Sequence, residues 1–152
     1  MARYKDTVPS SRSQADTFDY LARFSNTEDW DPGAVKGRDL QEGGPIGVGS
    51  RFSLDFKIGG RVQELVYEIT EYERPRRVRL VAEGTGFTSD DEIVVSKRGE
   101  RSEVTYAADV RLRGPLRLFD PLMRIGFGRV AGKAAEGLRA TLSRAGPDSS
   151  PG

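Results

Sequence analysis

The stretch FDYLARFSNTEDWDPG occupies residues 18–33 and combines a short helix signal with a tight turn and the chain's only tryptophan. Phe18 and Leu21 lie at helical spacing and open a narrow apolar face on an otherwise polar segment. Asn26 is expected to end this helix, because the Pro-Gly pair that closes the stretch forms a turn that a continuing helix cannot accommodate. The stretch therefore predicts a short amphipathic helix, followed by Trp30 and a turn that leads into non-helical structure.

The residues just before this stretch predict where the helix begins. Residues 3–8 have the character of a first short strand, which Pro9 is expected to end. Ser13 is followed three residues later by Asp16, a spacing that resembles a capping box with aspartate in place of glutamate. The Asp16 carboxylate also lies at the positive end of the helix dipole. Ser10, Ser11 and Ser13 are all available to cap this helix, and the spacing to Asp16 favours Ser13.

Downstream of residue 35 the spacing of the apolar residues changes from helical to alternating. At residues 51–58 every second side chain is apolar, so one face of the predicted strand is expected to be buried and the other exposed to solvent. Turns rich in glycine and proline separate the later alternating segments. The expected later strands cover residues 51–58, 62–72, 78–82, 87–96 and 103–113. Together with the first strand and a segment that starts near residue 35, they predict about seven antiparallel strands in a meander, because no helical crossover separates them.

One long helix is expected at the end of the chain, over residues 116–145. Its apolar residues recur at steps of three and four, while most of its arginines fall on the other side, so it must pack against an apolar sheet face. Gly126, Gly128 and Gly132 each cost about 1 kcal/mol relative to alanine inside a helix. They indicate either close backbone packing, which is favoured, or space left open for a ligand.

The composition excludes several classes of function. Lysine plus arginine (24) nearly balance aspartate plus glutamate (23), whereas a dedicated nucleic-acid binder has a marked basic excess. The chain has no cysteine and no histidine, which excludes disulfides, thiol nucleophiles, histidine-dependent catalytic pairs and the usual zinc sites. We therefore expect no metal, no cofactor and no nucleic-acid partner.

The length of 152 residues predicts a single domain over residues 1–145, followed by a disordered tail at 146–152. The first residues lack the apolar core of a secretion signal, and no apolar run is long enough to cross a bilayer. A cytoplasmic protein without integral membrane contact is the expectation. Arginine greatly outnumbers lysine, which indicates a GC-rich and bacterial genome.

Four motifs and their order carry a family resemblance. They are FxYLxxFSNxxxWDPG at 18–33, GPIGVGSRF at 44–52, VYEITEYERPRRV at 66–78 and GPLRLFDPLMR at 114–124. Together they resemble the START-like (SRPBCC) superfamily, and within it the polyketide cyclase/dehydrase and lipid-transport group, over almost the whole chain. The resemblance implies an α+β helix-grip fold: a curved antiparallel sheet of about seven strands wrapped around a long C-terminal helix, with one or two short helices after the first strand. It also implies an elongated apolar cavity between sheet and helix.

Candidate ligand-binding residues follow from the expected inner face of this fold. Any single inward aromatic residue is more often plain core than a ligand contact. Tyr67 and Tyr106 are the preferred polar groups, because a buried phenol needs a hydrogen-bond partner and pockets gain specificity through a few such groups. The full set of candidates is Trp30, Phe52, Phe56, Tyr67, Phe87, Tyr106, Met123, Gly126 and Phe127.

Three acidic residues in a row, Asp90, Asp91 and Glu92, raise the question of acid-base or metal chemistry. Neighbouring residues of a strand alternate faces, and one short cluster is a poor cage for a hard cation, so a solvated hairpin face is the favoured interpretation. The alternative is that Asp91 follows Phe87 and Ile93 inward. It would then be a buried carboxyl with a raised pKa, and it is the one weak catalytic candidate.

The arginines at positions 74, 76, 77 and 79 allow two interpretations. The favoured one is a solvated turn whose charges are balanced by Glu71 and Glu73. The alternative is a surface for an anionic head group or a membrane.

Three functions remain open at this point. The favoured one is binding or transport of a hydrophobic small molecule, such as a lipid, polyketide, quinone or sterol-like compound, by a monomer or homodimer without enzymatic activity. The second is a metal-free cyclase or dehydratase that uses a carboxylate or tyrosine as its acid or base. The third is a protein-interaction role that resembles the ribosome-associated toxin branch of the superfamily.

Overall fold

The computed structural model describes residues 2–41, 44–58, 60–84, 86–112 and 120–143, and the side chains of the last segment from residue 132 onward. The elements are β1 (Ala2–Ser10), α1 (Gln14–Ala22), the 3₁₀ helix η1 (Phe24–Asp29), β2 (Ala34–Asp39), β3 (Arg51–Ile58), β4 (Arg61–Glu73), β5 (Arg77–Gly84), β6 (Phe87–Arg98), β7 (Arg101–Leu112) and α2 (Asp120–Ser143). Strands β2 to β7 follow the alternating segments of the sequence closely. The expected first residues of the long helix, 116–119, and the predicted tail, 146–152, lie outside the described residues.

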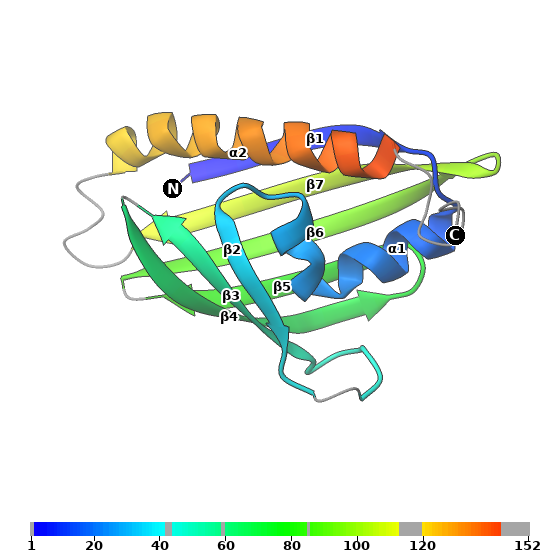
Figure 1. Ribbon diagram of the computed structural model, residues 1–152, viewed down its shortest axis with the longest axis horizontal. Coiled ribbons are helices and arrows are strands. Elements are labelled where there is room, and N and C mark those ends of the chain that lie inside the picture. Colours follow the sequence, from blue (N-terminus) through cyan, green and yellow to red (C-terminus); the bar gives the residue numbers. More distant parts are fainter. Residues whose placement is uncertain (1, 42–43, 59, 85, 113–119, 144–152) are drawn as a thin grey trace.

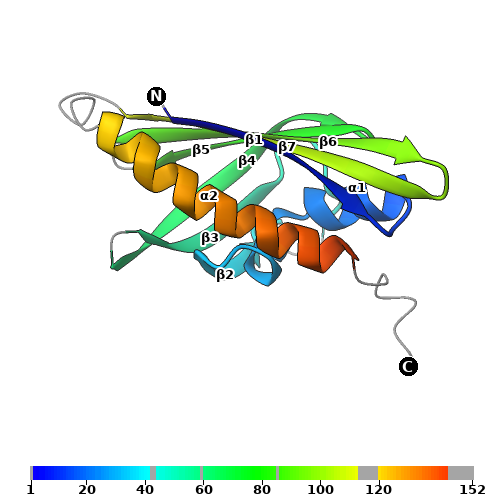
Figure 2. The ribbon, with the colours of Figure 1, turned by 90° about the horizontal axis from the view of Figure 1, so that it is seen from above.

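The described strands form one seven-stranded antiparallel sheet in the order β1-β7-β6-β5-β4-β3-β2. The sheet curls, and α2 lies along β1 and across the opening of the curl (Figures 1 and 2). This is the expected α+β helix-grip architecture. The expectation of a meander holds for β2 to β7 but is wrong for β1, which pairs with β7 and not with β2. The physical reason is that α1 and η1 carry the chain from one edge of the sheet to the other.

The first helix begins where the sequence indicates and ends earlier. The Asp16 backbone N–H donates to the Ser13 side-chain oxygen at 3.2 Å, so Ser13 caps α1. The helix ends at Ala22 and not at Asn26, because Arg23 leaves helical geometry with φ −78° and ψ 86°. A separate 3₁₀ helix then carries the chain to Trp30, whose backbone N–H donates to the Thr27 carbonyl at 3.2 Å.

Strand β1 also extends past the proline that was expected to end it. Pro9 pairs with Glu103, and Ser10 pairs with Ser102. A proline lacks the backbone N–H that a strand between two neighbours needs, but β1 is at an edge of the sheet. The edge position therefore tolerates Pro9 within the strand.

Buried hydroxyl groups join α1 to the sheet. The Thr17 hydroxyl lies 2.8 Å from the Ser10 hydroxyl and 2.8 Å from the Ser102 hydroxyl, and Ser102 in turn donates to the Arg12 carbonyl at 2.9 Å. Thr17, Ser10 and Ser102 are all buried. Because α1 precedes η1 directly, this network fixes the starting point of the segment that carries Trp30.

Replacing Thr17 with valine is expected to lower the free energy of unfolding by about 2 kcal/mol, because the valine keeps the shape of the side chain and leaves two buried hydroxyls short of a partner. Urea-induced unfolding measures the loss. Thr7→Val is the matched control: the Thr7 hydroxyl lies 3.1 Å from that of Thr105 at an exposed site, so about 0.5 kcal/mol or less is expected there. Equal losses in the two variants would contradict a structural role for the buried network.

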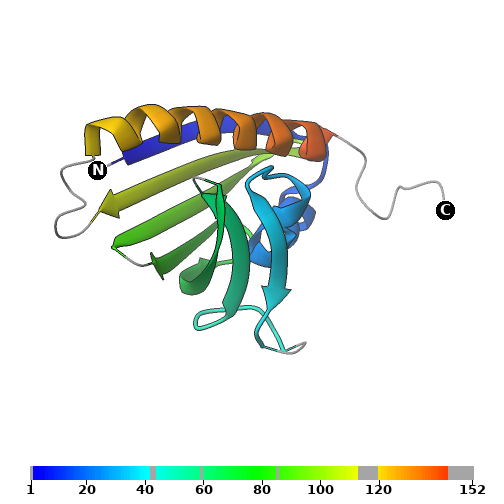
Figure 3. The ribbon, with the colours of Figure 1, turned by 60° about the vertical axis from the view of Figure 1, so that its left-hand side comes forward.

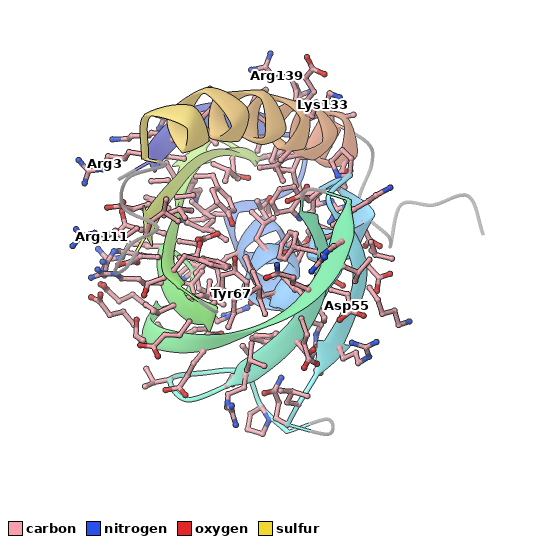
Figure 4. All side chains as sticks on the ribbon, turned by 90° about the vertical axis from the view of Figure 1, so that its left-hand side faces the viewer. Arg3, Asp55, Tyr67, Arg111, Lys133 and Arg139 are labelled. Atoms are coloured by element: carbon pink, nitrogen blue, oxygen red, sulfur yellow. The ribbon has the colours of Figure 1, made fainter. Side chains whose placement is uncertain are left out.

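The hydrophobic core lies inside the curl, between the sheet, α1, η1 and α2 (Figure 3). Leu138 and Leu142 of α2 are buried in it, and the Ser11 backbone N–H donates to the Leu142 carbonyl at 2.8 Å. Viewed along the curl, Figure 4 shows Tyr67 inside the sheet, while the side chains of Lys133 and Arg139 project from the outer side of α2. The expected polar and apolar sides of the long helix are therefore present in its described part.

The described glycines of α2 differ sharply in their surroundings. A Cβ added to Gly132 would meet no atom within 4 Å. A Cβ added to Gly137 would overlap the carbonyl oxygen of Trp30, so α2 approaches the end of η1 with its bare backbone. Close packing, the favoured interpretation for Gly126, Gly128 and Gly132, is therefore wrong at Gly132 and is found instead at Gly137, whereas the surroundings of Gly126 and Gly128 lie outside the description.

Candidate functional site

The inner face of β6 places a carboxyl group inside the curl. Ser89, Asp91, Ile93 and Val95 are buried at every second position, and Asp91 is only 5 % exposed. Phe87 and Ile93 lie on the same strand face as Asp91 and point inward. Because side chains alternate between the two faces of a strand, the Asp91 side chain must point inward as well. The favoured interpretation of the acidic cluster as a wholly solvated face is therefore wrong for Asp91.

The two acidic neighbours of Asp91 do point outward. Asp90 accepts two hydrogen bonds from Arg79, at 2.9 and 2.5 Å, and Glu92 accepts one from Arg77 at 2.6 Å. Both carboxylates are partly exposed on the convex side of the sheet. The solvated interpretation holds for these two residues.

Two hydroxyl groups donate to Asp91, and a third donates to one of these two. The Tyr106 phenol on β7 donates to Asp91 Oδ2, and the Ser89 hydroxyl donates to Oδ1 at 2.8 Å. The Tyr67 phenol on β4 donates to Ser89 Oγ at 3.5 Å. Both tyrosines predicted as polar groups thus belong to one hydrogen-bond cluster with Asp91. We call Ser89, Asp91, Tyr67 and Tyr106 the Asp91 cluster.

Burial changes the acidity of every titratable member of the Asp91 cluster. Loss of solvent raises the pKa of Asp91 to about 6, although the hydrogen bonds from Tyr106 and Ser89 act in the opposite direction. Burial and the nearby Asp91 charge raise the pKa of both Tyr67 and Tyr106 well above that of a free phenol. The carboxyl group is therefore the member that changes charge closest to neutral pH.

A second carboxyl group, that of Asp31, lies close enough to influence the Asp91 cluster. Its charge contributes to the raised pKa of Asp91, Tyr67 and Tyr106. Burial raises the pKa of Asp31 itself, and the Gly33 backbone N–H, which donates to Asp31 Oδ1 at 2.8 Å, lowers it. The turn after η1 thus adds negative charge to the same region.

Aromatic rings surround the Asp91 cluster. The Trp30 ring lies edge-on to Tyr106 with 5.6 Å between ring centroids, and the Phe56 ring lies 6.4 Å from that of Tyr67. Phe24 of η1 also contacts Tyr67, at 4.7 Å. Edge and tilted arrangements of this kind are favourable for aromatic pairs. The polar cluster is therefore set in an apolar and largely aromatic wall.

The solvent exposure of side chains differs along the inner face of the sheet. Toward α1 the inner residues are fully buried, as Ile93, Val95 and Val104 illustrate. Around and beyond Asp91 several inner residues keep part of their surface accessible. These are Phe56, Phe87, Tyr106 and Ala108. Cross-strand register places Ala108 beside Asp91 and on the same face.

The structure thus shows which of the predicted ligand-binding residues lie near Asp91. Tyr67 and Tyr106 belong to the Asp91 cluster, Trp30 and Phe56 lie against their rings, and Phe87 lies further along the same face of β6. Phe52 is fully buried in the core next to Tyr67 in the strand register. The side chains of Met123 and Phe127 and the surroundings of Gly126 lie outside the description, so their proposed roles stay predictions.

Sequence reasoning missed Ser89 and Asp31. Ser89 shares the period-two face of Phe87 and Ile93, so the alternation that predicts inward aromatic residues also places this hydroxyl inside. Asp31 directly follows the tryptophan that the sequence singled out. No local pattern shows that either residue approaches Asp91, because that proximity arises from pairing between distant strands.

The arginines near the β4–β5 turn are balanced by carboxylates. Arg74 donates two hydrogen bonds of 2.7 Å to Asp19, and Arg76 donates to Glu73 at 2.8 Å. Ion pairs with Glu71, Glu73, Asp90 and Glu92 engage Arg77 and Arg79. The favoured interpretation as a charge-balanced surface is confirmed.

Two further properties limit the kinds of site in the described part of the chain. There, no group of three or more aspartates or glutamates is arranged to hold a metal ion. Within the same residues, no helix is both long enough and apolar enough to span a bilayer.

A curled antiparallel sheet closed by a C-terminal helix defines the START-like fold class. The chain also belongs to a specific family within that class. Residues 1–143 match the family described as polyketide cyclase / dehydrase and lipid transport. No curated protein sequence matches the chain.

Solved structures show the same fold at low sequence identity. A START superfamily protein from Mycobacterium smegmatis aligns with a TM-score of 0.74 at 16% identity, covering 93% of this chain and 97% of the other. A conserved protein from Geobacillus kaustophilus aligns with a TM-score of 0.67 at 13% identity and coverages of 92% and 94%. The ginseng major latex-like protein 151 from Panax ginseng aligns with a TM-score of 0.60 at 17% identity and coverages of 93% and 97%. At such identities the likeness concerns the fold alone.

Proposed function

We propose that the protein binds a hydrophobic small molecule on the inner face of the curled sheet, beside the Asp91 cluster. The observation that carries the proposal is a hydrogen-bonded carboxyl and two phenols held among aromatic side chains at a place where the inner face stays partly exposed. Binding sites for small molecules combine apolar walls with a few convergent polar groups. A domain that needed only a stable core has no use for a buried carboxyl, whose desolvation opposes folding.

The location of Ala108 gives the proposal a direct test. Ala108 shares the inner face with Asp91 and is partly exposed, whereas its neighbour Ala107 pairs with Glu92 and Lys5 on the outer face. A phenylalanine at position 108 would occupy the space in which we place the ligand. Ala107→Phe adds the same ring to the opposite face and serves as the matched control.

The expected result uses Trp30 as the reporter, because it is the only tryptophan and contacts Tyr106. 1,4-Naphthoquinone, a neutral and apolar quencher, should quench Trp30 fluorescence saturably in the native protein and in Ala107→Phe. In Ala108→Phe its affinity should fall by about tenfold or more, since steric exclusion removes the contacts that bury its surface.

Two results would contradict the proposal. One is unchanged affinity in Ala108→Phe. The other is a loss of stability in Ala108→Phe that greatly exceeds the loss in Ala107→Phe, because it would show that side chains fill this part of the interior. Native mass spectrometry of the freshly purified protein complements the titration by giving the mass of any molecule that stays bound.

A second candidate function is supported by the position of Asp91 alone. A buried carboxyl with a pKa of about 6, directly hydrogen-bonded to a phenol, has the properties of a general base paired with a general acid. A cyclase or dehydratase acting on a bound polyketide-type substrate would use Asp91 to take a proton, with the Tyr106 phenol holding the Asp91 carboxylate in position through its hydrogen bond. Binding remains the favoured function, since it requires only the apolar wall and the polar cluster.

A further inference from the structure

The hydrogen atoms of the Asp91 cluster are all directed within the cluster itself. Each hydroxyl group carries a single proton to donate. Tyr106 gives its proton to Asp91 Oδ2, Ser89 gives its proton to Oδ1, and Tyr67 gives its proton to Ser89. The atoms that remain available to a ligand are oxygen lone pairs on the phenols and the carboxylate. When Asp91 is ionised, the cluster can accept hydrogen bonds but has no proton left to donate.

The charge around the cluster has the same sign throughout. Asp91 and Asp31 both contribute negative charge, and among the described residues the groups that shift the pKa of Asp91 are Tyr106, Ser89, Asp90 and Asp31. Among the side chains that the structure describes, the buried polar ones are serines, threonines and Asp91. The basic residues that neighbour β6, Arg77 and Arg79, are engaged with carboxylates on the outer face. An anionic group placed beside Asp91 would therefore meet like charge, and the side chains that the structure describes supply no cation there to compensate it.

The apolar wall disfavours a cationic ligand as well. Trp30, Phe56 and the tyrosine rings surround the cluster, so an ammonium group would lose its hydration there at a large cost. The Asp91 carboxylate is already stabilised by two donated hydrogen bonds, which weakens its demand for a counter-charge. A neutral hydroxyl group loses less hydration and still supplies the missing proton.

We infer that the ligand is an uncharged, largely apolar molecule with a phenol- or alcohol-type hydroxyl, which donates a hydrogen bond to the Asp91 cluster, and that the site rejects the corresponding carboxylate. This inference rests on the proposed function and adds the chemical class of the ligand. It separates hydroxylated aromatic or sterol-like compounds from fatty acids and other anionic lipids, which an apolar wall alone would accept equally well.

The test compares three probes of nearly the same shape by isothermal titration calorimetry at about pH 8. 2-Naphthol carries a hydroxyl donor, 2-methoxynaphthalene carries the same oxygen without its proton, and 2-naphthoate carries a carboxylate. At this pH a phenol, with a pKa of about 10, is neutral and a carboxylic acid, with a pKa of about 4, is ionised. We expect 2-naphthol to bind about tenfold or more tightly than either of the other two, since a hydrogen bond to a charged acceptor is made only by 2-naphthol.

Asp91→Asn and Asp90→Asn form a matched pair of variants. Both remove one carboxylate from β6, but only Asp91 faces the interior. Asp91→Asn should weaken 2-naphthol binding by about tenfold, because the variant lacks the charged hydrogen-bond acceptor. The same variant should bind 2-naphthoate about as tightly as it binds 2-naphthol, because the charge that repels the carboxylate is gone. Asp90→Asn should leave all three affinities within about twofold of the native values, because its effect is confined to a surface ion pair.

The possible outcomes separate this inference from the proposed function. If 2-naphthoate or 2-methoxynaphthalene binds the native protein as tightly as 2-naphthol, the proposed function stands and the inferred ligand class is wrong. If none of the three probes binds the native protein but 1,4-naphthoquinone does, the inferred ligand class is wrong; if 1,4-naphthoquinone does not bind either, the proposed function is wrong and the inference falls with it. Equal effects of Asp91→Asn and Asp90→Asn would also overturn the inference, because the preference would then not arise at the Asp91 cluster.

Discussion

Replacing Gly137 with alanine is expected to lower the free energy of unfolding by about 3 kcal/mol. The added Cβ would overlap the Trp30 carbonyl oxygen, a backbone atom that cannot turn away as a flexible side chain can. To relieve the overlap, α2 must move off η1 as a whole, which also loosens the packing of Leu138 and Leu142. Urea-induced unfolding followed by far-ultraviolet circular dichroism gives the free energy directly.

The control for this prediction is the same substitution one and a half turns earlier. A Cβ at Gly132 would meet nothing within 4 Å, so Gly132→Ala should raise the free energy of unfolding by about 1 kcal/mol through helix propensity alone. The two variants are thus expected to differ in sign. A stabilising effect of Gly137→Ala would show that α2 does not rest on the backbone of Trp30.

The second large effect concerns the pH dependence of stability in Asp91→Asn. Burial raises the pKa of Asp91 from 3.8 to about 6, so the folded protein binds a proton that the unfolded chain has already lost between these values. Stability contributed by the protonated carboxyl is complete below about pH 4 and is lost as the pH rises through about 6. The shift of about two pKa units corresponds to roughly 3 kcal/mol.

The measurement is the difference in unfolding free energy between Asp91→Asn and the native protein at about pH 4 and about pH 7.5. Asparagine does not ionise, so this difference should move in favour of the variant by about 3 kcal/mol between the two pH values. Tyr67, Tyr106 and Asp31 face Asp91, and Asp90 adjoins it along the chain, so they share its electrostatic environment.

Asp90→Asn provides the comparison on the outer face of the same strand. It removes a partly exposed ion pair with Arg79 and should change the stability by about 1 kcal/mol or less at both pH values. If Asp91→Asn showed no more pH dependence than Asp90→Asn, the carboxyl of Asp91 would have to be solvated. The Asp91→Asn protein also tests Asp91 as a catalytic residue: a proton-transfer activity that depends on Asp91 would be lost even at substrate concentrations that saturate the variant.

A stability gain from Asp91→Asn at neutral pH would itself be informative. It would mean that the native protein retains a buried ionised carboxyl at a cost in stability. Functional sites commonly carry such strained or desolvated groups, whereas cores do not. The gain would therefore support a binding or catalytic role for the Asp91 cluster independently of any ligand.

Much of the secondary structure was predictable because its signals are local. The Ser13 cap of α1 and the alternation in β3, β5 and β6 depend on residues only a few positions apart. The end of α1 was not predictable in this way. Asn26 lies in a second short helix, since the chain bends at Arg23 to bring η1 against the sheet.

The sequence by itself determined the α+β class, the course of six strands, the C-terminal helix and the family to which the chain belongs. It also determined that Asp91 shares a strand face with Ile93, because side-chain alternation is a property of a single strand. Only the tertiary structure decided that this face is the concave one, that Tyr67 and Tyr106 meet at Asp91, and that Gly137 is the helix glycine in contact with Trp30. These facts depend on pairing between strands and on the docking of α2, in which the contacting residues lie far apart in the chain and leave no periodic pattern between them.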